Sequence, residues 1–241
     1  YFSAALSLGA PDRPVSFTVP TGNFGDIFAG YAARRMGLPV ERLVIATNDN
    51  DILARTLASG VYETRGVVET TSPSMDIQVS SNFERLIYEA SGRNAETVVR
   101  AMQGLKQAGR FAVPEGTLEA IRRDFDAGRS TIDETAATIR SVLAGTGYLI
   151  DPHTATAVKV ARETRRGKAP MVVLSTAHPA KFPAAVEAAC GTRPALPAWL
   201  GDLMEREERY TVLPSDPKMV EDHISRLTRA ALGAARMRSG S

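Results

Sequence analysis

One short run of residues could bind a phosphate group. Residues 21–26 read Thr-Gly-Asn-Phe-Gly-Asp, after a β-rich run at 15–19 and before helical spacing at 26–36. The glycines allow backbone N–H groups to approach an anion closely, and the positive end of the following helix attracts it further. Thr21 and Asn23 could add side-chain contacts. The run matches neither a nucleotide-binding P-loop nor Gly-x-Gly-x-x-Gly. Spacing alone therefore leaves two interpretations, a phosphate loop or a plain strand-to-helix turn.

Two further groups carry polar side chains at positions where a ligand could lie. Ser81, Asn82 and Arg85 stand together, and an arginine fork beside hydroxyls could clamp a second phosphate. The alternative is a helix start capped by Ser81 or Asn82, with the arginine in solvent. Thr176 follows an apolar run at 170–175, and its hydroxyl could either contact a ligand or cap a turn.

The histidines, the nearby lysine and the cysteine are weaker candidates. We interpret His153 as a helix-start residue that packs near the site, His178 as structural, and Lys181 as a surface or interdomain ion-pair partner. The histidines are too scattered to predict a metal centre. Cys190 is the single cysteine, so no disulfide can form within the chain, and we expect a reducing, cytoplasmic compartment.

The elements that position these residues follow an α/β pattern. Strand, helix and strand alternate with about a dozen helical residues between, which predicts a mainly parallel sheet flanked by helices. Loops that follow the carboxyl ends of such strands bind ligands. We expect helices at 1–8, 26–36, 52–59, 153–165 and 182–190, and strands at 15–19, 42–46 and 170–175.

Residues 82–144 have almost entirely helical spacing and predict an inserted helical subdomain, with helices at 83–91, 96–108, 114–127 and 132–143. Capping sequences at 130–134 mark the start of the last of these. The α/β domain would then comprise 1–81 and 145–191. We expect a polar, helical tail over 192–241, with 236–241 disordered.

Composition excludes several classes of protein. Among 241 residues, 44% are hydrophobic and 23% charged, with a formal net charge of +2 and a pI of about 8.8. Basic and acidic residues alternate and aromatic residues are sparse, so we expect no nucleic-acid partner. No apolar run reaches the roughly 20 residues of a membrane span. We expect a small-molecule substrate and a monomer or homodimer.

Five runs together resemble the threonine synthase family of pyridoxal-phosphate enzymes, which has the tryptophan-synthase-β-like fold (fold type II). They lie at 20–26, 46–51, 75–85, 151–155 and 174–182, in the family's order. The resemblance implies that pyridoxal 5'-phosphate is the cofactor and that Asp26 caps a helix. Thr176 would face the pyridine nitrogen, where a hydroxyl moderates the cofactor's electron sink. The cofactor phosphate would be bound, largely through backbone N–H groups, by Gly22, Asn23, Phe24 and Gly25.

The resemblance also requires a lysine that forms a Schiff base with the cofactor, in a Ser-Phe-Lys-Asp-like segment before the phosphate loop. All lysines here follow that loop, at 106, 159, 168, 181 and 218. The chain also opens on a helix without methionine or N-cap, so we expect a longer parent protein.

For that parent, the resemblance implies a carbon–oxygen lyase in threonine biosynthesis. It would convert O-phospho-L-homoserine and water to L-threonine and phosphate. Two alternatives remain: a threonine or serine dehydratase, although its tetraglycine-type loop is absent, and a non-catalytic fragment that binds the cofactor or an anion.

Overall fold

The structure, a computed structural model, describes residues 1–228. The chain divides into two compact units, Tyr1–Ala195 and a second that begins at Leu196. The expectation of disorder at 236–241 lies outside the described residues. Within residues 1–228, no helix is long and apolar enough to cross a membrane.

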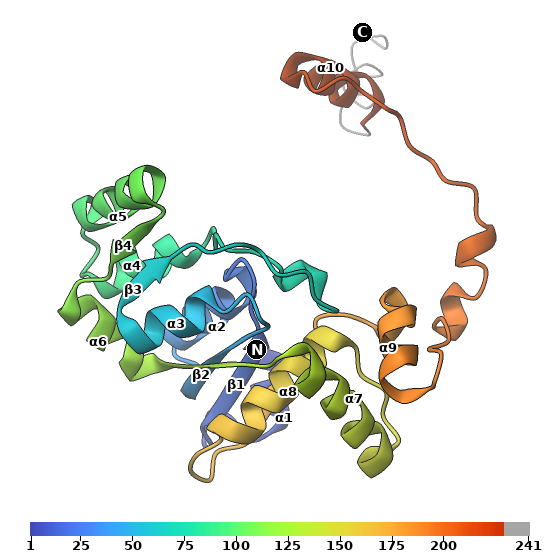
Figure 1. Ribbon diagram of the computed structural model, residues 1–241, viewed down its shortest axis with the longest axis horizontal. Coiled ribbons are helices and arrows are strands. Elements are labelled where there is room, and N and C mark those ends of the chain that lie inside the picture. Colours follow the sequence, from blue (N-terminus) through green and yellow to red (C-terminus); the bar gives the residue numbers. More distant parts are fainter. Residues whose placement is uncertain (229–241) are drawn as a thin grey trace, which may run out of the picture. The chain divides into compact units, whose positions relative to one another are not determined.

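A four-stranded parallel sheet forms the centre of the first unit (Figure 1). Its order is β5-β2-β1-β6, with β1 at Val15–Pro20, β2 at Val40–Thr47, β5 at Phe125–Arg129 and β6 at Met171–Val173. Thr18 of β1 pairs with Val44 on one side and Val173 on the other. The mainly parallel sheet predicted from sequence is confirmed. Because all four strands run the same way, the loops after β1 and β6 leave from the same edge.

Both faces of the sheet are covered, which explains why every residue of β1 is buried. Phe17 and Leu43 belong to one face and pack in the main core with Ile27 of α2, Gly25–Arg35. Val44 faces the other way and packs against Val160 of α8, Pro152–Thr164. The alternation has the period of two that a strand imposes on its side chains.

The helices of the first unit lie close to their predicted positions. A small antiparallel pair, β3 at Val61–Glu63 and β4 at Arg110–Ala112, was not predicted. Thr131 and Glu134 form the expected capping box at the start of α7. The α-helices are α1 Phe2–Ser7, α2 Gly25–Arg35, α3 Ile52–Ser59, α4 Phe83–Ala90, α5 Ala95–Ala108, α6 Glu115–Asp124, α7 Ile132–Thr146, α8 Pro152–Thr164 and α9 Pro183–Cys190.

One predicted helix is wrong at its C-terminal end. The helix expected at 114–127 stops at Asp124, and the next residues form β5, paired in parallel with β2. Phe125 is buried and continues the helical spacing of Leu118 and Ile121, so local periodicity runs past the true end. Pairing with β2 overrides that local pattern. The boundaries of an inserted subdomain at 82–144 stay a prediction, but this range supplies a strand to the main sheet.

The last strand is shorter than expected. β6 covers three residues, Met171–Val173, and all three are half-buried, whereas the sequence predicted a buried strand at 170–175. The second unit contains the short 3-10 helices Ala198–Leu200 and Leu203–Glu205 and the helix α10 at Pro217–Leu227. Asp216 caps α10 by accepting a hydrogen bond from the Lys218 N–H.

Candidate functional site

The loop after β1 begins at the end of the sheet. Thr21 N–H donates to the carbonyl of Ala46 on β2 at 2.8 Å, and the Thr21 hydroxyl donates to the carbonyl of Val19 at 2.6 Å. Thr21 is therefore a strand-end residue whose hydroxyl proton is used within the chain, and a side-chain contact between Thr21 and a ligand stays a prediction. Asn23 Oδ1 accepts from the Gly25 N–H at 2.9 Å and so shapes the turn into α2.

Two backbone carbonyls of this loop are hydrogen-bonded to residues 80–82. Ser80 Oγ donates to the Gly22 carbonyl at 2.8 Å, and Asn82 donates twice to the Asn23 carbonyl. In a trans peptide the N–H points opposite to the C=O. The N–H groups of Asn23 and Phe24 therefore point away from 80–82, and neither has a hydrogen-bond partner within residues 1–228. Two free donors at the start of a helix can bind an anion.

The backbone of Phe24 adopts a left-handed conformation that is unfavourable for most residues. Its φ is 68°, in the left-handed region, which costs about 1–2 kcal/mol for a residue with a Cβ. Its ring is 1% exposed and packs against Phe83 and Phe125, with centroids 5.4 and 5.9 Å away. Burial of the ring offsets the backbone cost, so the side chain anchors the loop from inside the core.

Asp26 is not the helix-capping acid that the resemblance implied. The N-cap of α2 is Phe24, without a side-chain cap, and Asp26 lies in the first turn. The Tyr1 hydroxyl donates to the Asp26 carbonyl at 2.8 Å and contacts its Oδ1 at 3.1 Å. Burial and the neighbouring carboxylate raise the pKa of Tyr1 above its ordinary value, so its hydroxyl remains a donor.

A buried polar network positions the segment that covers the loop. Asn48 and Asn50 each donate through Nδ2 to Asp76 Oδ1, at 2.7 and 3.1 Å. This network holds the 3-10 helix Pro73–Met75 so close to Gly22 that a Cβ there would lie 2.7 Å from the Ser74 carbonyl oxygen. The runs at 46–51 and 75–85 therefore act as scaffold for the loop.

The start of α8 brings a second polar group to the same region. Asp151 is fully buried and accepts hydrogen bonds from the His153 N–H at 2.8 Å, from His153 Nδ1 at 3.0 Å and from the Thr154 hydroxyl. Burial opposes ionisation of Asp151, but the hydrogen bonds outweigh it and hold its pKa below the ordinary value. Thr154 Oγ1 also lies 3.2 Å from Ser175 Oγ, within hydrogen-bonding distance, and this contact ties α8 to the loop after β6.

A cavity of about 250 Å³ joins these elements. Gly22, Asn23 and Thr176, all predicted site residues, meet there although they are far apart in sequence, while Phe24 and Gly25 do not line it. Of the residues that line the cavity, Ser74 is the one that lies outside the five runs named from sequence, because long-range hydrogen bonds place it. The cavity is lined by Pro20, Gly22, Asn23, Asp26, Ser74, Met75, His153, Thr176, Ala177, Lys181 and Phe182.

Lys181 and His178 differ in their roles. Lys181 lines the cavity, and its ammonium group lies 6.0 Å from the centroid of the Phe182 ring. Within residues 1–228 it has no carboxylate partner, so the ion pair suggested from sequence is not formed there. His178 Nδ1 accepts from the Ala180 N–H at 3.1 Å and caps a short 3-10 helix, as its structural interpretation expected.

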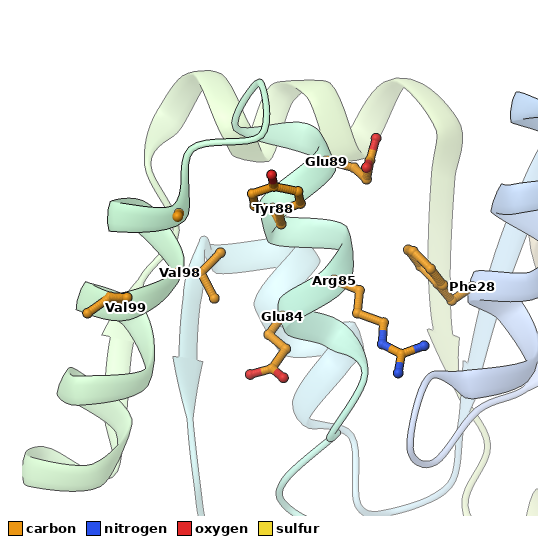
Figure 2. Close-up of a pocket in the computed structure, with 8 residues that line it drawn as sticks. Phe28, Glu84, Arg85, Tyr88, Glu89, Val98 and Val99 are labelled. Atoms are coloured by element: carbon orange, nitrogen blue, oxygen red, sulfur yellow. The ribbon is translucent and has the colours of Figure 1, made fainter.

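The three residues suggested for a second phosphate are not brought together. Asn82 holds the loop 22–25, and Ser81 is exposed and lines neither of these two cavities. Arg85 lines a separate cavity of about 500 Å³ between α2, α4 and α5, where its side chain extends toward Phe28 (Figure 2). A substrate role for these residues stays a prediction.

The fold and site define a class of protein: a parallel α/β fold with an anion cradle after a central strand. A family model described as threonine synthase, C-terminal, matches residues 154–224. The threonine synthase of Pseudomonas aeruginosa is 52% identical over 227 residues, which cover 93% of this chain and 48% of that protein. That of Saccharomyces cerevisiae is 44% identical over 196 residues, 74% of this chain and 38% of that protein.

Solved structures agree. The structure of a threonine synthase from Brucella melitensis, described as bound to PLP, is 69% identical, with a TM-score of 0.89 over 95% of this chain and 49% of that one. The yeast threonine synthase structure is 36% identical, with a TM-score of 0.79 over 94% of this chain and 50% of that one. This chain belongs to the threonine synthase family. It spans about half the length of the curated relatives it matches.

Proposed function

We propose that the cavity binds pyridoxal 5'-phosphate, with its phosphate at the loop 22–25. The observation that carries this is the pair of N–H groups of Asn23 and Phe24 at the start of α2, for which residues 1–228 provide no hydrogen-bond partner. Gly22 has no Cβ, which lets the backbone of Ser74 and Met75 pack directly against the loop and shape the cavity. Lys181, without a carboxylate partner among the described residues, supplies a cation to the same cavity. These residues fit an aromatic phosphate.

For the whole protein we propose the threonine synthase reaction, in which O-phospho-L-homoserine and water give L-threonine and phosphate. Bound pyridoxal phosphate supplies an electron sink for carbanions of the substrate. This chain would bind the cofactor phosphate through backbone N–H groups and orient the ring through the Thr176 hydroxyl. Its Asn48–Asp76 network would hold residues 73–75 against the loop and so keep the cradle in shape.

The lysine that holds the cofactor covalently would come from outside these residues. Lys181 is the one lysine that lines the cavity. It lies in a loop after β6, whereas the family's lysine belongs to a segment before the phosphate loop. The scarcity of cysteine supports a cytoplasmic enzyme. A monomer or homodimer stays a prediction.

Two measurements test the proposal. The 241-residue chain should bind pyridoxal phosphate, and borohydride should not trap the cofactor on any of its lysines. Trapping on Lys181 would contradict our assignment of the covalent lysine to a separate segment. The whole protein should release phosphate from O-phosphohomoserine with an equal amount of threonine. An oxo acid in place of threonine would indicate a dehydratase, and binding without turnover would indicate a non-catalytic protein.

A further inference from the structure

His153 has a ring nitrogen for which the described part of the chain provides no partner. The residue is 3% exposed, and its Nε2 is buried without a hydrogen bond within residues 1–228. Buried polar atoms are nearly always hydrogen-bonded in folded proteins, so each exception needs a reason. A structural role at the start of α8 accounts for Nδ1, which contacts Asp151, but leaves Nε2 unexplained.

Asp151 determines which nitrogen of the ring carries the proton. Its lowered pKa keeps the carboxylate ionised, and an ionised carboxylate only accepts hydrogen bonds. Nδ1, 3.0 Å from Asp151 Oδ1, must therefore be the donor. In the neutral ring Nε2 therefore carries a lone pair and can accept a hydrogen bond.

The ring of His153 belongs to the wall of the cavity that we assign to the cofactor. It lines that cavity together with Gly22, Thr176 and Lys181. The Phe182 ring packs against it, with centroids 4.7 Å apart and planes at 48°. Asp151 on one side and Phe182 on another fix the ring in place. A fixed acceptor beside an aromatic-ligand cavity has the geometry of a binding residue.

We propose that His153 is a ligand-binding residue of this cavity, whose Nε2 accepts a hydrogen bond from the hydroxyl group on the ring of bound pyridoxal phosphate. The inference rests on the proposed function, since it assumes that this cofactor occupies the cavity. Asp151 acts through His153 as a positioning residue. The pair would add a contact to the ring that is separate from the phosphate loop and from Thr176.

Two substitutions distinguish a binding role from a structural one. In His153→Asn the amide nitrogen replaces Nδ1 and can still donate to Asp151, but nothing replaces Nε2. In His153→Gln the amide oxygen reaches the place of Nε2 and can accept, while the contact with Asp151 is lost. We expect the dissociation constant of pyridoxal phosphate to rise about 3- to 10-fold in the Asn variant and less than about twofold in the Gln variant. The reverse order would overturn the proposal.

Histidine NMR gives a second readout, made on the wild-type chain. Only three histidines are present, at 153, 178 and 223, so ¹⁵N-labelled histidine gives a simple spectrum. We expect His153 to carry its proton on Nδ1 without ligand and its Nε2 resonance to move when pyridoxal phosphate is added. His153→Asn assigns the signal, and His223→Asn, in the second unit, is the matched control.

The failures of the two proposals can be told apart. If the wild-type chain does not bind pyridoxal phosphate, both the proposed function and this inference are wrong. A chain that binds it while the His153 signal stays unchanged at saturation overturns this inference alone.

Discussion

The carbonyl oxygen of Asn23 accepts two hydrogen bonds from Asn82, one from its backbone N–H at 3.0 Å and one from Nδ2 at 2.9 Å. Asn82 is also the N-cap of α4, although its side chain makes no cap hydrogen bond. The Asn82 side chain therefore hydrogen-bonds the loop 22–25 and does not cap its own helix. The position of α4 and the direction of the loop N–H groups are therefore coupled.

Asn82→Ala removes one of these two hydrogen bonds and leaves the loop less preorganised. We expect the dissociation constants of pyridoxal phosphate and inorganic phosphate to rise about 2- to 10-fold. Titration with each ligand measures this. Asn94→Ala is the matched control, because Asn94 caps α5 by accepting from Thr97 N–H. It should cost about 0.5–2 kcal/mol of stability without changing affinity. Equal ligand affinity in Asn82→Ala and wild type would show that Asn82 does not contribute to ligand binding.

Gly22→Ala tests how closely the loop 22–25 packs against the 3-10 helix Pro73–Met75. Its Cβ would lie 2.7 Å from the Ser74 carbonyl oxygen and 3.3 Å from Met75 Cα, both backbone atoms that cannot rotate away. We expect a loss of about 1–3 kcal/mol in the free energy of unfolding, together with weaker phosphate binding.

Gly145→Ala is the control for this change, because nothing lies within 4 Å of a Cβ there and the position is within α7. That substitution should stabilise the chain by about 0.5–1 kcal/mol. Urea unfolding measures both effects. A Gly22→Ala variant as stable as the wild type would show that residues 73–75 move freely.

Local patterns were sufficient for much of the fold. Helices such as α3, Ile52–Ser59, were predicted to the residue because apolar side chains repeat at helical spacing between clear breakers. β1 and β2 were recognisable as short β-rich runs. The pattern failed at Phe125, which suits the buried face of a helix and the core face of a strand equally well. Only pairing with β2, some 80 residues away, decides between them.

The site shows the same limit. The loop 22–25 could be singled out because its residue types carry a local signal, and Thr176 because the run at 174–182 resembles the family. Ser74 has none, since it reaches the cavity through contacts of Asp76 with distant asparagines. Arg85 lies close to Ser81 and Asn82 in sequence, yet the packing of α4 places its side chain at another cavity. Proximity along the chain did not predict proximity in space.

Thr176 can be tested through its hydroxyl. The residue is exposed and lines the cavity, so its replacement should change the free energy of unfolding by less than about 0.5 kcal/mol. If the hydroxyl faces the cofactor ring, Thr176→Val should raise the dissociation constant of pyridoxal phosphate about 2- to 10-fold and shift the absorbance of the bound cofactor. Thr176→Ser should restore both. Equal spectra in the Val variant and the wild type would return Thr176 to a turn-capping role.

Asp151 should make the stability of the first unit depend on pH. Its pKa in the folded chain lies below the ordinary value of 3.8. A carboxylate with a lowered pKa stabilises the fold above its unfolded pKa, and this contribution is lost as the pH falls through the folded value. Asp151→Asn removes the titration and leaves a buried donor beside His153. We expect it to cost about 1–3 kcal/mol at neutral pH.

The difference between wild type and Asp151→Asn in the free energy of unfolding should therefore be constant from pH 7 to about pH 5 and shrink below about pH 4. Urea unfolding followed across this range measures it. Asp202→Asn is the control: hydrogen bonding to Arg206 also lowers the pKa of Asp202, but this carboxylate is exposed on the second unit. Its replacement should leave the acid unfolding of the first unit unchanged. A difference for Asp151→Asn that persists undiminished to pH 3 would mean that folding does not lower the pKa of this carboxylate.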